Sequence, residues 1–148
     1  MLRRTAFSNQ MNVYEKALRD LFGKSEELKD IKYTGKTCLA RLDKDLRVKL
    51  QFVETGTAGS YTAIRASIIN RIDGEVDKQT FRFRDMVPAR SKENLFGQDY
   101  PYIWVYDGKA EWYGKPLSPM EQQLVRNSIL DYVGMYLEPQ MTMDEQSM

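Results

Sequence analysis

The sequence predicts an α+β domain in which an antiparallel sheet of about five or six strands carries an N-terminal and a C-terminal helix on one face. Apolar residues recur at helical spacing near both ends of the chain, whereas they alternate with polar residues in the middle. The 148 residues are enough for one domain with its own hydrophobic core. We therefore expect a single domain over residues 1–139, followed by a flexible C-terminal tail over residues 140–148.

The first helix is predicted over residues 8–22. Its apolar residues fall three or four positions apart and so share one face, namely Phe7, Met11, Tyr14, Leu18 and Leu21. Ser8 or Asn9 is expected to cap its start, and Gly23 is well placed just beyond its end. Residues 25–28 then predict a short turn or helix that leads into the sheet.

The period changes from helical to alternating over residues 36–85. The clearest strand covers residues 46–52, with Leu46, Val48, Leu50 and Phe52 facing the core and Arg47, Lys49 and Gln51 facing the other way. Residues 37–42 are expected to pair with it as a hairpin, because the polar segment 43–45 lies between them.

Two more strands are expected to complete an antiparallel meander. Residues 61–71 form the third strand, with Ile64, Ala66 and Ile68 inward, and residues 80–85 form the fourth, with Phe81 and Phe83 inward. Asp73-Gly74 marks the turn between them, and its polar neighbours indicate a loop of more than two residues. Residues 86–101 are polar, carry Pro88, Gly97 and Pro101, and predict a loop.

Residues 102–113 predict a second hairpin. Aromatic and β-branched residues flank Asp107-Gly108, which is the strongest short hairpin signal in the chain. A two-residue turn there pairs Tyr106 with Lys109, Trp104 with Glu111 and Tyr102 with Tyr113.

The last helix has an explicit start signal. Ser118 is expected at the N-cap, Pro119 at the first helical position and Glu121 at the third, which together make a capping box. An apolar stripe follows and ends before Pro139, and it consists of Val125, Ile129, Tyr132, Val133 and Tyr136.

The composition excludes several kinds of chemistry. The chain has no His and one Cys, so it offers no imidazole base for a Ser or Cys nucleophile and no zinc ligand set. We expect no catalytic residues, no cofactor and no metal. The lone cysteine excludes an internal disulfide, no apolar run is long enough for a bilayer, and the N-terminus lacks a secretory signal, so a cytoplasmic protein without membrane contact is expected.

Three weaker motifs favour structural roles. Gly35-Lys36-Thr37 resembles the end of a phosphate-binding loop, but Asp30 stands where the first glycine of that motif belongs, and a strand follows instead of a helix. Cys38 lies in a predicted strand and is expected to be a small buried hydrophobe. Residues 73–77 lack the spacing of a calcium loop and are expected to form a solvated turn.

The predicted sheet has an unusual outward face. Its outward positions carry cations, whereas the acidic residues fall in predicted turns or at strand ends. Residues 118–148, by contrast, hold five acids and one cation, a net charge of −4. The overall charge of +1 therefore hides an asymmetry. The outward cations are Arg41, Arg47, Lys49, Arg65, Arg71, Arg82 and Arg84.

The second hairpin adds aromatic residues. Alternation places Tyr102, Trp104, Tyr106 and Tyr113 together on the face opposite Ile103, Val105, Ala110 and Trp112. Exposed Tyr, Trp and Arg residues are enriched at binding hot spots. This aromatic face is either exposed for binding or covered by a helix or by the loop 86–101, and both alternatives remain open at this point.

These observations predict a small non-catalytic binding protein, of the accessory or inhibitory kind that phages and mobile elements also encode. Its expected interface consists of Arg47, Lys49, Arg65, Arg82, Arg84, Tyr102, Trp104, Tyr106 and Tyr113. A protein partner ranks first. Nucleic acid, stacked on aromatics and paired with cations, ranks second because the chain lacks a basic excess. An enzyme without histidine ranks third, and a homodimer through the aromatic face or an edge strand is also compatible with the sequence.

Overall fold

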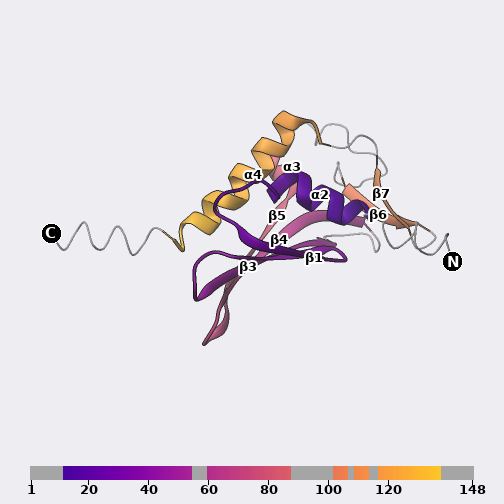
Figure 1. Cartoon of the computed structure of the whole chain (residues 1–148). Helices are drawn as coiled ribbons and strands as arrows, with labels where there is room; N and C mark the ends of the chain where they lie inside the picture. Colours follow the sequence, from indigo (N-terminus) through magenta and orange to yellow (C-terminus); the bar gives the residue numbers. More distant parts are fainter. Residues whose placement is uncertain (1–11, 55–59, 88–101, 107–108, 114–116, 138–148) are drawn as a thin grey trace.

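The structure, a computed structural model, describes residues 12–54, 60–87, 102–106, 109–113 and 117–137. A twisted antiparallel sheet forms one layer, and two helices lie across one of its faces (Figure 1). The predicted α+β class, with an N-terminal and a C-terminal helix on a meander and a hairpin, is confirmed. In chain order the elements are α2 (Val13–Phe22), β1 (Lys29–Thr34), β2 (Thr37–Arg41), β3 (Leu46–Glu54), β4 (Ser60–Asn70), β5 (Gly74–Arg82), α3 (Phe83–Met86), β6 (Tyr102–Tyr106), β7 (Lys109–Tyr113) and α4 (Pro119–Gly134).

The strand β4 is the centre of the sheet. One of its edges pairs with β3 along nearly its whole length, and the other edge is shared by two strands. Most of that second edge pairs with β5, while Ser60 and Tyr61 pair with Trp104 and Ile103 of β6. Strands β1 to β5 are therefore a meander, and the hairpin of β6 and β7 extends the same sheet, which has seven strands among the described residues.

The register between β3 and β4 builds the core. Val48 lies opposite Ile68, Leu50 opposite Ala66 and Phe52 opposite Ile64, and all six side chains are buried. They pack in one cluster with the apolar faces of α2 and α4. The inward positions predicted for residues 46–52 and 61–71 are thereby confirmed, since alternation places every second side chain on the same face.

The helix α2 begins later than predicted. Asn12 is its N-cap and accepts a hydrogen bond from the Glu15 backbone N–H at 2.7 Å, so the cap of this helix is neither Ser8 nor Asn9. Those two residues lie outside the described part of the chain. The helix ends at Gly23, where an added Cβ would stand 2.6 Å from the Arg19 carbonyl oxygen, so this close approach requires glycine. The predicted core positions Tyr14, Leu18 and Leu21 are buried.

The strand β1 is not predicted by the sequence. β1 is polar and largely exposed, so it has no clear alternation to reveal it, and Asp30 interrupts its pairing with β2 at a bulge. Gly35 begins the tight turn to β2 with a φ of +59°, a conformation that favours glycine. The phosphate-loop resemblance of Gly35-Lys36-Thr37 is thus a hairpin turn followed by a strand, as expected.

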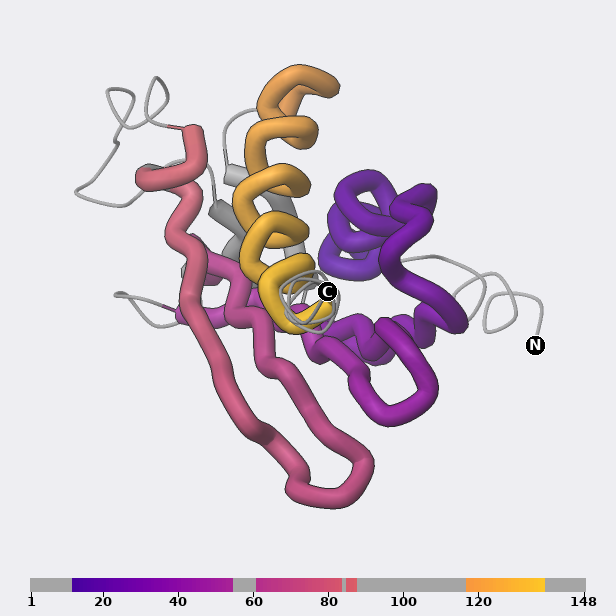
Figure 2. Tube along the Cα trace, turned by 90° about the vertical axis from the view of Figure 1, so that its left-hand side faces the viewer, coloured from indigo at the N-terminus to yellow at the C-terminus, as the bar shows by residue number. Residues whose placement is uncertain are grey.

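The strand predicted over residues 80–85 has different boundaries. β5 ends at Arg82, and Phe83 begins the short helix α3. The two phenylalanines Phe81 and Phe83 are both buried as expected, but Phe83 reaches the core from a helical turn. β5 starts at Gly74, and the end of the β4–β5 hairpin extends past the helices (Figure 2). Most residues of this strand are exposed, so no apolar alternation marks it in the sequence. The turn covers only residues 71–73, so the loop predicted between the two strands is shorter than expected. Residues 74–77, which the sequence predicts to lie in a solvated turn, belong to β5.

The capping box of α4 is confirmed. The Ser118 hydroxyl accepts a hydrogen bond from the Glu121 backbone N–H at 3.2 Å, and the Glu121 carboxylate accepts one from the Ser118 N–H at 2.8 Å. Pro119 occupies the first turn. The buried face of the helix consists of Val125, Ile129, Tyr132 and Val133.

One side chain of α4 completes the end of α2. The Arg126 guanidinium donates through Nε to the Leu21 carbonyl oxygen and through Nη2 to that of Asp20, the latter at 3.1 Å. Carbonyls in the last turn of a helix have no partner within the helix. Arg126 therefore satisfies two of them and joins the two helices directly.

A second polar contact joins α4 to the sheet. The hydroxyls of Tyr132 and Tyr136 both donate to Oδ2 of Asp77 on β5, Tyr132 at 2.9 Å. The hydrogen bonds from Tyr136 and Tyr132 hold the pKa of the Asp77 carboxyl below its usual value.

The packing of α4 predicts the effect of truncating its core face. Ile129 is fully buried, whereas Leu124 on the same helix is 44% exposed. Ile129→Ala should lower the free energy of unfolding by about 2 to 5 kcal/mol, and Leu124→Ala should change it by less than about 0.5 kcal/mol. Urea unfolding followed by circular dichroism measures both. Equal losses would show that α4 is not packed in this orientation.

The Asp77 contact predicts a pH dependence. Because folding lowers this pKa, the stabilisation is present above the unfolded value, about 3.9, and is lost as the pH falls through the lower folded pKa. The Tm of Asp77→Asn should lie below that of the unchanged protein at pH 7, and the difference should shrink under acid conditions. Thermal melts from pH 7 to about pH 2.5 test this, and parallel curves would contradict it.

Candidate functional site: a cationic sheet face

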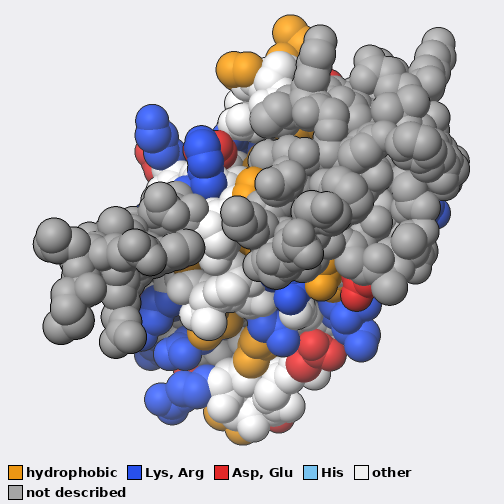
Figure 3. Space-filling model, turned by 90° about the vertical axis from the view of Figure 1, so that its right-hand side faces the viewer, with side chains coloured by type: hydrophobic (Ala, Val, Ile, Leu, Met, Phe, Trp, Pro, Cys, Tyr) orange, Lys and Arg blue, Asp and Glu red, His pale blue; other side chains and the backbone are white. Residues whose placement is uncertain are grey.

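The sheet face opposite the helices carries cations from neighbouring strands. Arg47 and Lys49 lie on β3 and Arg65 on β4, at the alternate positions whose neighbours are buried in the core, so their predicted orientation is correct. Lys and Arg side chains gather in the lower half of Figure 3, which is the sheet side of Figure 1. Lys32 on β1 and Lys78 on β5 share this face through the strand register, and sequence reasoning missed both.

The other predicted cations have different surroundings. Arg82 lies at the end of β5 on this face and is half-buried. Arg84 belongs to α3 rather than to a strand, which corrects its predicted outward position on the sheet, and its side chain lies outside the described part. Arg71 lies in the turn after β4 and not on the sheet.

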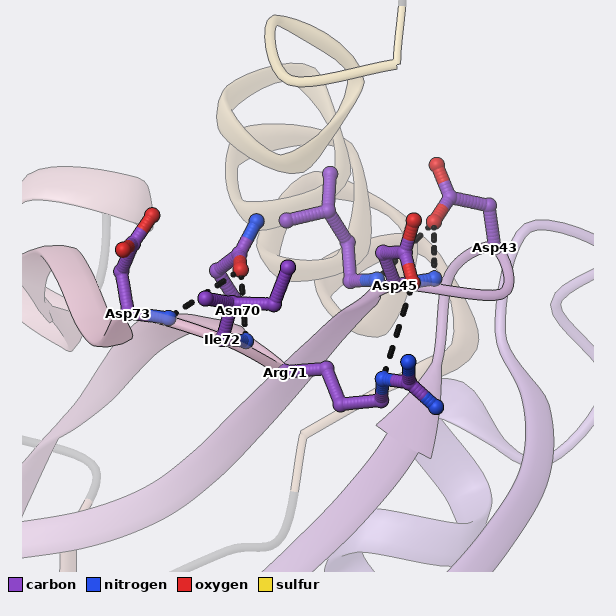
Figure 4. A network of polar contacts seen from close by, with 7 residues as sticks. Asp43, Asp45, Asn70, Arg71, Ile72 and Asp73 are labelled. Atoms are coloured by element: carbon purple, nitrogen blue, oxygen red, sulfur yellow. Dashed lines mark hydrogen bonds and ion pairs between the residues drawn. The ribbon is translucent and has the colours of Figure 1, made fainter.

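The turn after β4 is bonded to the loop between β2 and β3. Arg71 donates its backbone N–H to the Asp45 carbonyl oxygen at 2.8 Å, and its Nε lies 3.8 Å from the Asp45 carboxylate (Figure 4). The Asn70 side chain accepts hydrogen bonds from the next turn residues, and Asp43 does the same in the other loop. Arg71 is thus a structural cation and does not belong to the face.

Two cations stand directly opposite each other on adjacent strands. Arg41 of β2 pairs in register with Arg47 of β3, and such pairs have Cβ atoms about 4.5 to 5.5 Å apart. Lys29 of β1 lies opposite Arg41 on the other side. Like charges in this position destabilise a sheet. This arrangement of charges therefore does not stabilise the fold.

Lysines flank the middle of the face. Ser67 of β4 is only 1% exposed, although it lies on the face that none of the described helices covers. Its register partners are Lys49 on one side and Lys78 on the other. Lysine stems commonly lie along a surface while the ammonium group stays in water, and the stems of these two lysines start on either side of Ser67.

Few carboxylates neutralise these cations. Arg41 donates through Nε to Oδ2 of Asp30 at 2.8 Å, and Lys78 lies 3.9 Å from Glu75. The predicted restriction of acids to turns and strand ends is wrong for Glu75 and Asp77, which lie inside β5. On this face, the cations that form no ion pair with any described residue are Lys29, Lys32, Arg47, Lys49 and Arg65.

A shallow cleft opens in this face over β1, β2 and β3. Its volume is about 340 Å³, and its lining consists of Asp30, Lys32, Leu39, Ala40, Arg41 and Arg47. Asp30 has a φ of +53°, a left-handed conformation that Asp and Asn tolerate better than most residues. The hydrogen bond from Arg41 holds the pKa of the Asp30 carboxyl below its usual value, so Asp30 stays ionised at neutral pH.

The aromatic hairpin is confirmed in its backbone. Tyr102 lies opposite Tyr113, Trp104 opposite Glu111 and Tyr106 opposite Lys109, as predicted from a two-residue turn. The side chains of these residues lie outside the described part of the structure. The binding role predicted for the four aromatics therefore remains a prediction.

No family model, curated protein or solved structure matches the chain. Among the described helices, none is long and apolar enough to cross a membrane. In the same part of the chain, no three His, Cys, Asp or Glu side chains gather as metal ligands would.

Cys38 is buried in β2, as predicted, with 1% of its surface exposed. Burial raises the pKa of its thiol to about 12, so the reactive thiolate is scarce at neutral pH. Ellman's reagent at pH 8 should therefore label the folded protein very slowly and the urea-unfolded protein completely within minutes. Rapid labelling of the folded protein would show that β2 opens readily or that Cys38 is accessible.

Proposed function

We propose that this protein is a non-catalytic binding protein of the accessory or inhibitory kind, and that its cationic sheet face docks on an acidic surface of a partner protein. The observation that carries the proposal is the set of unpaired cations, Lys29, Lys32, Arg47, Lys49 and Arg65, on a sheet face that no described helix covers. Complementary charge steers association and fixes the orientation of docking.

The burial pattern supports this reading. Apolar side chains of the meander are gathered under α2 and α4, while the other face offers guanidinium and ammonium groups with hydroxyls and amides between them. Arg is enriched at binding hot spots. The aromatic hairpin of β6 and β7 continues the same sheet, so its Tyr102, Trp104, Tyr106 and Tyr113 would extend the interface. A single thiol buried at Cys38 suits a protein of the reducing cytoplasm.

Nucleic acid is the second candidate. The same cations could contact phosphates, and the hairpin aromatics could stack on bases. The net charge of +1 favours it less, because nucleic-acid-binding domains usually carry a clear basic excess. An enzyme ranks third, and a second copy of this chain remains an alternative partner.

Charge reversal tests the proposed face. The double variant Arg47→Glu with Lys49→Glu should bind a fluorescein-labelled oligoglutamate peptide at least about tenfold more weakly than the unchanged protein. Fluorescence anisotropy at about 50 mM salt measures the affinity, and the binding should weaken at about 200 mM. Both side chains lie on the outer face, so the double variant should keep its circular dichroism spectrum.

The matched control places the same charge change on the helix side. Lys16 belongs to α2 and Lys24 follows it, and both are exposed, so Lys16→Glu with Lys24→Glu should bind the peptide as before. If both double variants bind the peptide equally weakly, the assignment of peptide binding to the cationic sheet face is wrong. DNA and RNA oligonucleotides of mixed sequence complete the experiment: binding that falls steeply with salt, without peptide binding, would favour the nucleic-acid alternative.

A further inference from the structure

We propose that the cleft over β1, β2 and β3 binds a side-chain carboxylate of the acidic partner, and that Asp30 occupies part of this site in the free protein as a built-in competitor. The inference rests on the partner-binding function proposed above. It adds the chemical group that is bound, the residues that hold it and a reason why the affinity is limited.

The cleft has a surplus of positive charge. Three cations line it, Lys32, Arg41 and Arg47, together with the single carboxylate of Asp30. Only Arg41 forms a direct ion pair there, with Asp30, whereas Lys32 and Arg47 form none with a described residue. Two positive charges therefore remain for a ligand, on side chains that come from β1 and β3.

The arrangement of these charges costs stability. Arg41 and Arg47 are direct register partners, a position in which like charges repel and opposite charges would attract. One anion placed between the two guanidinium groups removes the repulsion and accepts hydrogen bonds from both. Charge-assisted bonds of this kind are stronger than neutral ones, and the planar guanidinium matches a carboxylate in shape.

Asp30 itself shows that the cleft accepts a carboxylate. Its Oδ2 accepts a hydrogen bond from Arg41 Nε at 2.8 Å, so Arg41 is already in carboxylate-binding geometry. A carboxylate is therefore the group whose contact with this cleft the structure itself shows. An aspartate or glutamate of an acidic protein segment supplies this group.

The Asp30 contact is of a kind that a ligand can replace. The Asp30 side chain is 69% exposed and that of Arg41 is 39% exposed, and ion pairs this open to solvent contribute little free energy. Asp30 also contacts only one of the two opposed guanidinium groups. A partner carboxylate that reaches both Arg41 and Arg47 contacts one guanidinium group more than Asp30 does, but it must first displace Asp30 from Arg41.

A single substitution tests the competition with a gain of binding. Asp30→Asn removes the charge, and Asn tolerates the left-handed φ of +53° at this position. The variant should bind the oligoglutamate peptide about two- to fivefold more tightly than the unchanged protein. A gain cannot result from unfolding, and thermal melts confirm that the fold is kept.

Two controls separate competition from overall charge. Asp20→Asn changes the net charge equally, but Asp20 lies on α2 and pairs with Lys16, so this variant should bind as the unchanged protein does. In an Arg41→Gln background the gain from Asp30→Asn should vanish, because Asp30 competes with the ligand only through its contact with Arg41.

The outcomes distinguish the two proposals. If the unchanged protein binds the peptide and Asp30→Asn binds it no more tightly, the competitor is refuted while the cationic face stands. An equal gain in Asp20→Asn would also refute it, since the effect would then be one of net charge. If Asp30→Asn strengthens binding of a DNA oligonucleotide but not of the peptide, the assignment of a carboxylate is wrong. If the unchanged protein does not bind the peptide at all, both proposals fail.

Discussion

The pairing of β3 with β4 is the constraint on which the rest of the molecule depends. Six side chains from these two strands are almost completely buried under the helices, from Val48 opposite Ile68 to Phe52 opposite Ile64. Because successive side chains point to opposite faces, a shift of one residue would exchange the buried set for the charged one. The core therefore fixes the orientation of Arg47 and Lys49 as firmly as that of their apolar neighbours. A charged surface on this fold is positioned by the hydrophobic face behind it.

The parts of the structure that could be predicted from the sequence are those whose conformation a single local rule determines. Alternation alone places Arg47 and Lys49, and the capping box of Ser118 and Glu121 marks the start of α4. β1 could not be recognised because an exposed edge strand needs no apolar pattern. Two of the residues that line the cleft, Asp30 and Lys32, belong to this strand. The contact of Asp30 with Arg41 joins residues 11 positions apart across a bulge, so no local pattern reveals it. The position of α3 depends on tertiary packing, which gives Phe81 and Phe83 the same burial in different elements.

The two faces of the sheet contribute differently to stability. The helix side holds the apolar cluster and the polar links that orient the helices, including the contact of Asp77 with Tyr132. The open side carries repulsive charges that folding does not need. The edge at β1 has a further property, because a bulge, a left-handed Asp30 and the charged Lys29 and Lys32 disfavour the addition of another strand. The protein can thus expose a wide sheet face without offering this edge for aggregation.

The contact between Arg126 and α2 has a consequence for the order of assembly during synthesis. Arg126 lies 105 positions after the Leu21 carbonyl that it satisfies. At ribosomal rates this separation corresponds to roughly 5 to 20 s, during which α2 has left the exit tunnel without its partner. A helix of 10 residues is marginal by itself in water. The last-turn carbonyls of α2 therefore gain their partner only after the C-terminal helix has been made.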